Sequence, residues 1–322
     1  MNRKLEVCPV AAFLASAVLL AQSDEWKSLM ERGQALQRAA NYSQAAATYR
    51  DAVRIARGQQ LVLALNSLGL VYEELGRFTE AERYLRRALA KLEEGNRNKA
   101  DCALLLTNLA LVYREAGQTI KSEALLHQAI DLETEALPPG DARLTLARTA
   151  LAEVVLIDGR YSEAEKLLQE SLAVFEKQPQ RWQREIGTVL NDLGVVRQMQ
   201  GRNDEAVRLF RQAIATPEAE FWPGHPVLLR PLINLARVQT AIGRWDDADA
   251  IFRRAVAIAE HRLATEHPEY SEVLMSYARF LRATGHKREA KSLEARSRSA
   301  QEEMARRDGA GLTIDASAFR PK

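Results

Sequence analysis

The side chains best suited to recognising another molecule are asparagines and arginines that recur near equivalent points of a repeating pattern. An asparagine amide offers both a donor and an acceptor, so it matches a peptide backbone group whatever the side chain beside it. An arginine guanidinium pairs with a carboxylate through two parallel hydrogen bonds. These residue types therefore predict recognition of an extended segment. The candidates are Asn66, Asn108, Asn191, Asn234, Arg114, Arg230, Arg237, Arg279 and Arg282.

Catalytic chemistry has no comparable support in the sequence. A His-Glu-x-x-His motif, a phosphate-binding glycine loop and paired cysteines are all missing from it. His261 and His267 flank a loop that contains Glu266, and such a group could bind a metal ion. Helix capping and solvent exposure explain histidines in loops far more often. The sequence predicts no enzyme, no cofactor and no metal centre.

The elements that must position the asparagines and arginines form a repeat close to 42 residues long. The stretch from Leu68 to Leu89 predicts two amphipathic helices joined at a turn, because its apolar residues follow i, i+3, i+4 spacing. Within it, Gly69 and Ala81 are small enough to let the two helices lie close together. Turn glycines recur at intervals of 41, 42, 42, 42 and 42 residues, at Gly76, Gly117, Gly159, Gly201, Gly243 and Gly285. A fixed period of this length predicts an all-α solenoid of about seven antiparallel helix pairs.

Three departures from the repeat carry information. Ala40 stands where the first hairpin should have its turn glycine, and Ser122 replaces the small alanine of the third hairpin. In the last hairpin Glu294 and Ser297 replace apolar residues. A polar outer helix is expected of a terminal repeat, because nothing stacks on it.

Composition and charge exclude several classes of protein. The chain has 322 residues, of which 47% are hydrophobic, and its 45 basic and 43 acidic residues leave a formal net charge of +2. This near-neutral balance gives no general attraction to nucleic acid or anionic membranes. RNA-binding helical repeats are strongly basic and shorter than 42 residues, so a nucleic-acid partner is not expected.

The first and last segments differ from the repeat array, which we expect at residues 24–306. Residues 1–22 combine Arg3 and Lys4 with a short apolar run, as a secretory signal does. Export to the periplasm or the medium is therefore expected, with no stable membrane span after cleavage. The alternatives are an extra apolar helix or a membrane tether, in which case the protein would be cytoplasmic or membrane-tethered. Residues 307–322 form a C-terminal tail. Within the repeat array, Cys102 is expected to be a small buried residue.

The repeat resembles the tetratricopeptide repeat, and within that superfamily the 42-residue kinesin-light-chain type. The resemblance covers residues 26–297. It rests on the small pairs Gly69 with Ala81 and Gly194 with Ala206, on the turns 159–164 and 243–248, and on the loops His225-Pro226 and His267-Pro268. The resemblance implies a right-handed superhelix that binds proteins or peptides. The heptad coiled coil that precedes the repeats in kinesin light chains is missing, so a motor-adaptor role is not implied.

In such a solenoid the first helix of each hairpin lines the concave side. Positions 13, 10 and 6 before each turn glycine should then face the groove. Leu63, Leu70, Leu104 and Leu111 make its early part apolar, while Arg230, Arg237, Arg279 and Arg282 make its late part basic. We expect an extended segment to bind there with carboxylates towards the arginines. The alternative is that the leucines are buried between hairpins and the arginines are plain surface.

Two functions fit this architecture. The first is a non-catalytic scaffold or adaptor that binds a protein or peptide segment in the groove. The second is a chaperone-like or assembly factor for exported proteins, which would expose apolar side chains in the groove and accept many apolar sequences.

The small residues at the helix contacts allow a test of the inside and outside assignments. Replacing Ala206 or Ala248 with leucine should overpack a hairpin and lower the free energy of unfolding by about 1–3 kcal/mol. Replacing exposed arginines of the groove should leave it almost unchanged. Chemical denaturation of purified variants measures both, and equal effects in the two groups would contradict the assignments.

Overall fold

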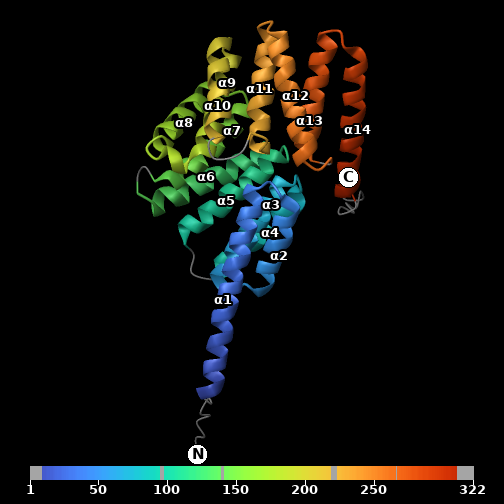
Figure 1. Cartoon of the computed structure of the whole chain (residues 1–322). Coiled ribbons are helices and arrows are strands. Elements are labelled where there is room, and N and C mark those ends of the chain that lie inside the picture. The colour runs from blue at the N-terminus through green and yellow to red at the C-terminus, as the bar shows by residue number, and fades with distance from the viewer. Residues whose placement is uncertain (1–8, 95–97, 139–140, 219–222, 266, 310–322) are drawn as a thin grey trace, which may run out of the picture.

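The computed structural model describes residues 9–94, 98–138, 141–218, 223–265 and 267–309 (Figure 1). In this part of the chain the secondary structure is helical. The α-helices are α1 (Pro9–Arg38), α2 (Tyr42–Ile55), α3 (Gly58–Glu74), α4 (Phe78–Glu94), α5 (Lys99–Glu115), α6 (Thr119–Ala136), α7 (Ala142–Ile157), α8 (Tyr161–Phe175), α9 (Gln183–Met199), α10 (Asn203–Glu218), α11 (Leu229–Ala241), α12 (Trp245–Arg262), α13 (Pro268–Ala283) and α14 (Lys287–Gly309). Two short 3-10 helices, Pro179–Arg181 and Pro226–Leu228, precede α9 and α11.

The helices pack as consecutive antiparallel pairs, from α1 with α2 to α13 with α14. Each pair stacks on the next, so Figure 1 shows the hairpins following one another around a curved path. The odd-numbered helices from α3 to α13 also contact one another across neighbouring hairpins. They form the inner layer of the superhelix, as the repeat predicts. The all-α solenoid fold is confirmed.

A left-handed residue ends the first helix of every hairpin. After α3, the Gly76 amide donates to the Glu73 carbonyl at 2.8 Å and the Arg77 amide to the Tyr72 carbonyl at 2.8 Å. These two bonds satisfy carbonyls that the end of the helix would otherwise leave unpaired. Gly76 has φ +66°, and the five later turn glycines are left-handed as well.

The first hairpin makes the same turn without glycine. Ala40 has φ +53°, the only positive φ of a non-glycine residue among those described. Its amide bonds to the Gln37 carbonyl at 2.9 Å, and the Asn41 amide bonds to the Leu36 carbonyl at 2.9 Å. Ala40 therefore adopts a conformation that is strained for a residue with a Cβ atom.

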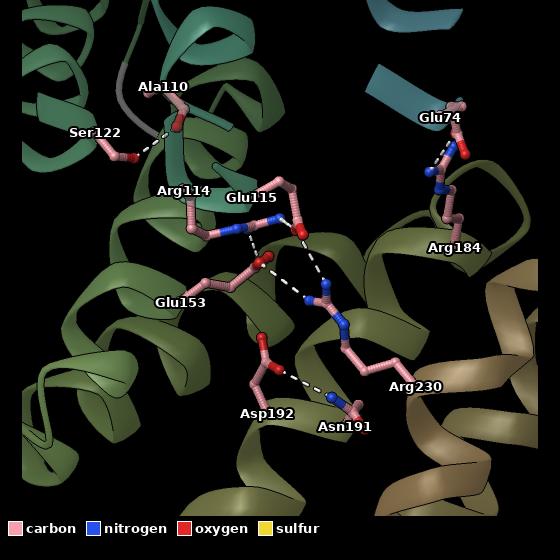
Figure 2. A network of polar contacts seen from close by, with 10 residues as sticks. All are labelled: Glu74, Ala110, Arg114, Glu115, Ser122, Glu153, Arg184, Asn191, Asp192 and Arg230. Atoms are coloured by element: carbon pink, nitrogen blue, oxygen red, sulfur yellow. Dashed lines mark hydrogen bonds and ion pairs between the residues drawn. The ribbon is translucent and has the colours of Figure 1, made fainter. Parts of the chain in front are cut away.

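Small residues allow the two helices of a hairpin to approach closely. A Cβ atom added to Gly194 would lie 2.6 Å from the ring of Phe210, which is fully buried. Ala206 and Ala248 are also fully buried. Ser122, which replaces alanine in the third hairpin, is buried too, and its hydroxyl donates to the Ala110 carbonyl at 2.7 Å (Figure 2). The predicted small positions are thus the places where the helices meet.

The last hairpin differs from the expectation that both Glu294 and Ser297 lie on a polar outer face. Glu294 is partly exposed and pairs with Arg282, as a terminal repeat allows. Ser297 is fully buried instead, and its hydroxyl forms a 2.6 Å hydrogen bond with that of Ser271 on α13. The expectation that Ser297 lies on a polar outer face is wrong, because a serine partner satisfies it inside the hairpin.

The ends of the chain are described only in part. The proposed signal segment includes residues 1–8, and most of the C-terminal tail is residues 310–322, so both extend outside the described residues. Pro9 begins α1, which projects beyond the other helices at the bottom of Figure 1. None of the described helices combines the length and the apolar composition of a membrane span. Cys102 is buried, as predicted.

The strained turn of the first hairpin gives a stability prediction. Ala40→Gly should raise the free energy of unfolding by about 1 kcal/mol, because glycine adopts positive φ without a Cβ clash. Denaturant titration of the variant measures the change. Gly117→Ala is the reciprocal control and should destabilise by a similar amount. If Ala40→Gly lowers the free energy of unfolding instead, the left-handed conformation of Ala40 does not strain the native protein.

Candidate functional site

The superhelix has a partly open cavity of about 440 Å³ on its concave side. Leucines of the early inner helices form an apolar wall, while charged residues and the loops before α11 and α13 form the rest. Leu104 in this wall is 40% exposed. The alternative that the groove leucines are buried between hairpins is therefore wrong for Leu104. The apolar residues of the wall are Leu70, Leu104, Leu111 and Leu146.

The cavity is closed on one side because the second and seventh hairpins meet. His267 caps the start of α13, and its Nδ1 atom accepts a hydrogen bond from the Glu269 amide at 3.1 Å. The Nε2 atom must then carry the proton, and it donates to the Glu74 carbonyl at the end of α3 over 2.9 Å. In Figure 1 the lower ends of α11 and α13 accordingly lie beside α3 and α4.

Two further contacts support this closure. The guanidinium of Arg184 on α9 pairs with the Glu74 carboxylate at 3.1 Å (Figure 2). Pro268 packs against the turn at Gly76, where an added Cβ atom would lie 2.3 Å from the proline ring. The second hairpin thus contacts the fifth hairpin and the seventh.

A network of ion pairs lies on the inner wall and joins three hairpins (Figure 2). Arg114 on α5 pairs with Glu115 at 2.6 Å and with Glu153 on α7. Arg230 on α11 pairs with Glu115 at 3.0 Å and reaches Glu153 at 3.8 Å. Burial alone would raise the pKa of Glu115, but Arg114 and Arg230 outweigh burial and hold this pKa at about 2. All of these side chains line the cavity.

This network changes the expectation that arginines make the late part of the groove basic. Arg230 is not available as open basic surface, because carboxylates of earlier hairpins already pair with it. Arg114 differs from Arg230 in being buried, since only 9% of its side chain is accessible, against 45% for Arg230. Removing Arg114 would leave Glu153 without its closest cation, so the expectation of an unchanged stability does not apply there.

The predicted asparagines pair with one another across neighbouring hairpins. The Asn108 amide donates to Asn66 at 2.8 Å, and the Asn234 amide donates to Asn191 at 2.9 Å. Asn108 and Asn191 line the cavity, whereas Asn66 and Asn234 support them. Each pair leaves part of its donor and acceptor capacity unused. Their role in binding stays a prediction.

The remaining predicted residues divide into two groups. Leu70, Leu111, Arg114 and Arg230 line the cavity. Leu63, Arg237, Arg279 and Arg282 are exposed residues outside its lining, and Arg282 pairs with Glu294 on its own hairpin. The structure thus brings together the inward positions of the middle hairpins. It does not extend the cavity to Arg237 of the sixth hairpin or to Arg279 and Arg282 of the seventh.

Two glutamates of the cavity were not predicted from the sequence. Burial, followed by the charges of Glu74 and Glu115, raises the pKa of Glu73 to about 8. Burial also raises the pKa of Glu269 to about 7, against the opposing charge of Arg230. Both lie in helical stretches where an acidic residue ordinarily faces solvent. The sequence carries no signal for them, because their environment arises from the closure.

The histidines of the two proline loops act as helix caps. His225 accepts a hydrogen bond from the Val227 amide at 3.1 Å, and burial lowers its pKa to about 4. His267 caps α13 in the same way. Within the described residues, no group of three or more histidines, cysteines and acidic residues is arranged to hold a metal ion.

Comparison with known proteins agrees with the fold. A family model described as the MalT-like TPR region matches residues 17–294, and the chain belongs to this family of tetratricopeptide repeat proteins. The predicted resemblance to tetratricopeptide repeats is therefore confirmed. No curated protein matches the sequence significantly.

Several solved structures share the fold at low sequence identity. A Rap protein complexed with Competence and Sporulation Factor has a TM-score of 0.65 and 15% identity, with 95% of this chain and 89% of that chain covered. NprR in complex with its cognate peptide NprX has a TM-score of 0.64 and 13% identity, over 83% of this chain and 75% of that chain. BtubC (BKLC) from P. vanneervenii has a TM-score of 0.50 and 22% identity, over 70% and 91%. These likenesses establish the fold alone.

The raised pKa of Glu73 predicts a pH-dependent stability. Its pKa moves from 4.5 to about 8 on folding, so folded protein binds more protons than unfolded protein between these values. The contribution of Glu73 protonation to the free energy of unfolding is fully present below pH 4.5 and is lost as pH rises through 8. The groups that face it are Glu74, Glu115, Arg114 and Arg184.

Glu73→Gln should therefore raise the thermal midpoint above pH 8 and leave it nearly unchanged near pH 5. Melting curves over this pH range measure the difference. Glu170→Gln, an exposed residue of α8, is the control and should shift the midpoint equally little at both ends. A Glu73→Gln variant that loses stability at high pH would contradict the assigned environment.

Proposed function

We propose that the protein is a non-catalytic adaptor that binds an extended peptide or a segment of a partner protein in the concave cavity. One observation carries the proposal: a cavity of about 440 Å³ with the half-exposed Leu104 in an apolar wall and asparagine amides beside it. This volume lies within the range of roughly 300–1,000 Å³ that is usual for ligand pockets. An apolar wall gives binding energy, while the amides match backbone groups.

Two of the structural relatives support this proposal. The Rap protein is complexed with Competence and Sporulation Factor, and NprR is in complex with its cognate peptide NprX. Each relative has a TM-score above 0.6, at 0.65 and 0.64. A solenoid of similar curvature can therefore hold a peptide, which makes the same use reasonable for this chain.

A chaperone-like or assembly role is the second candidate. Leu63 is 46% exposed and Leu104 is 40% exposed, as expected of a protein that accepts many apolar sequences. The ion pairs of the inner wall favour a narrower choice of bound segment. Binding of unrelated apolar peptides with similar affinity would favour the chaperone-like role.

Export is part of the same proposal. The basic start and short apolar run of residues 1–22 support it. N-terminal sequencing of the purified protein would then begin after Ala21 or Ser23.

The apolar wall allows a direct test of binding. The Leu70→Ala, Leu104→Ala double variant should retain about tenfold less partner than the wild type, because two apolar contacts with the bound segment are lost. Quantitative mass spectrometry after affinity purification from the source cells measures the retained amount.

The matched control is Ile120→Ala, Ile157→Ala, which removes two exposed apolar side chains outside the cavity. The control variant should retain as much partner as the wild type does. If the control loses the partner and the cavity variant keeps it, binding occurs at another surface. Circular dichroism confirms beforehand that both variants are folded.

A further inference from the structure

The charges of the cavity do not balance. Three arginines line it, and each one pairs with glutamates: Arg184 with Glu74, and Arg114 and Arg230 with Glu115 and Glu153. Glu73 on α3 and Glu269 on α13 also line the cavity. In the described structure their carboxyl groups form no hydrogen bond and no ion pair. The cavity therefore contains two acidic groups that form no direct ion pair, although the charges of Arg114 and Arg184 act on Glu73 and that of Arg230 acts on Glu269.

The two carboxyl groups lie in the same electrostatic environment, although they come from opposite ends of the array. Burial opposes the ionisation of both, and the charges of Glu74 and Glu115 act on both. A third carboxyl group close to the network is also incompletely satisfied. Asp192 is only 4% exposed, and its Oδ1 atom accepts a hydrogen bond from Asn191 at 3.0 Å while Oδ2 has no partner.

Figure 2 shows the Asp192 carboxyl group on the side of Glu153 and Arg230, next to the cavity-lining Asn191. A buried acceptor without a donor costs free energy. Such unsatisfied buried groups are uncommon in natural proteins and usually have a structural or functional reason. Asp192 lies beside the cavity rather than in its lining, and together with the two cavity-lining glutamates it favours an occupant that supplies positive charge and hydrogen-bond donors.

We propose that the bound segment inserts a lysine or arginine side chain between Glu73 and Glu269, next to an apolar residue that packs on Leu70 and Leu104. This inference rests on the proposed function and adds the chemistry of the ligand. A basic side chain matches the unpaired carboxylates, since an ionised donor forms shorter and stronger hydrogen bonds to them than a neutral donor does. An acidic segment would find no unpaired arginine in the cavity, because each of its arginines already forms an ion pair with a glutamate.

Selection from a library of random short peptides tests the proposal. The immobilised full-length protein should enrich peptides that contain lysine or arginine beside an apolar residue, and should deplete acidic peptides. The Glu73→Gln, Glu269→Gln variant should lose the preference for basic residues. It should remain folded, because glutamine removes two ionisations that burial opposes.

Glu170→Gln, Glu302→Gln is the matched control, as it removes the same charge from exposed positions of α8 and α14. It should retain the preference of the wild type. An unchanged preference in the cavity variant, or its loss in the control, would show that the selected charge reflects the whole surface rather than these two glutamates.

A second measurement tests the contact between the basic residue of the peptide and the two glutamates, Glu73 and Glu269. Replacing the basic residue of a selected peptide with norleucine should weaken binding to the wild type about tenfold, and to the Glu73→Gln, Glu269→Gln variant by no more than about twofold. Equal losses for both proteins would overturn the contact. Fluorescence anisotropy with a labelled peptide measures the four affinities.

The outcomes separate this inference from the proposed function. Enriched peptides that lose binding to Leu70→Ala, Leu104→Ala but show no basic preference would support the cavity as a binding site and overturn the inference alone. Failure to enrich any peptide, or binding that the leucine variant leaves unchanged, would overturn both.

Discussion

Close packing of the two helices inside each hairpin is the constraint on which the structure depends. Fully buried alanines, and glycines such as Gly194 against Phe210, set the distance between the helices. A left-handed residue then reverses the chain at the same point of every hairpin. Because each hairpin stacks on the next in nearly the same way, a small rotation accumulates along the array. Over the described hairpins this rotation brings the second hairpin against the seventh.

The closure changes the properties of the inner helices. In an open solenoid, the ends of α3 and α13 would face solvent, and Glu73 and Glu269 would be ordinary surface residues. In the closed superhelix they line a confined space with Glu74, Glu115 and Arg230. Ion pairs satisfy part of this charge and leave part of it unsatisfied. A binding site commonly has this mixture, because its polar groups gain their full set of partners only when the ligand is present.

The sequence predicts the local structure well because its signals lie within one hairpin. The positions of the turns, with Ala40 at the turn of the first hairpin, and the small residues at the helix contacts follow from spacing and side-chain size. The inward direction of Leu104, Asn191 and Arg230 also follows, since the inner helix has a fixed offset from its turn. The predicted charge of the groove was wrong at Arg230, because its partner Glu115 lies 115 residues earlier in the chain. No periodic pattern identifies such a pair.

The contact between Glu74 and His267 joins residues 193 positions apart, and it has a consequence for how the array can vary. Open solenoids change length readily, as a duplicated or deleted unit alters only its immediate neighbours. Here one additional hairpin would carry α13 past the end of α3, and one fewer would leave it short. The number of repeats is therefore as much a part of the site as the residues that line it.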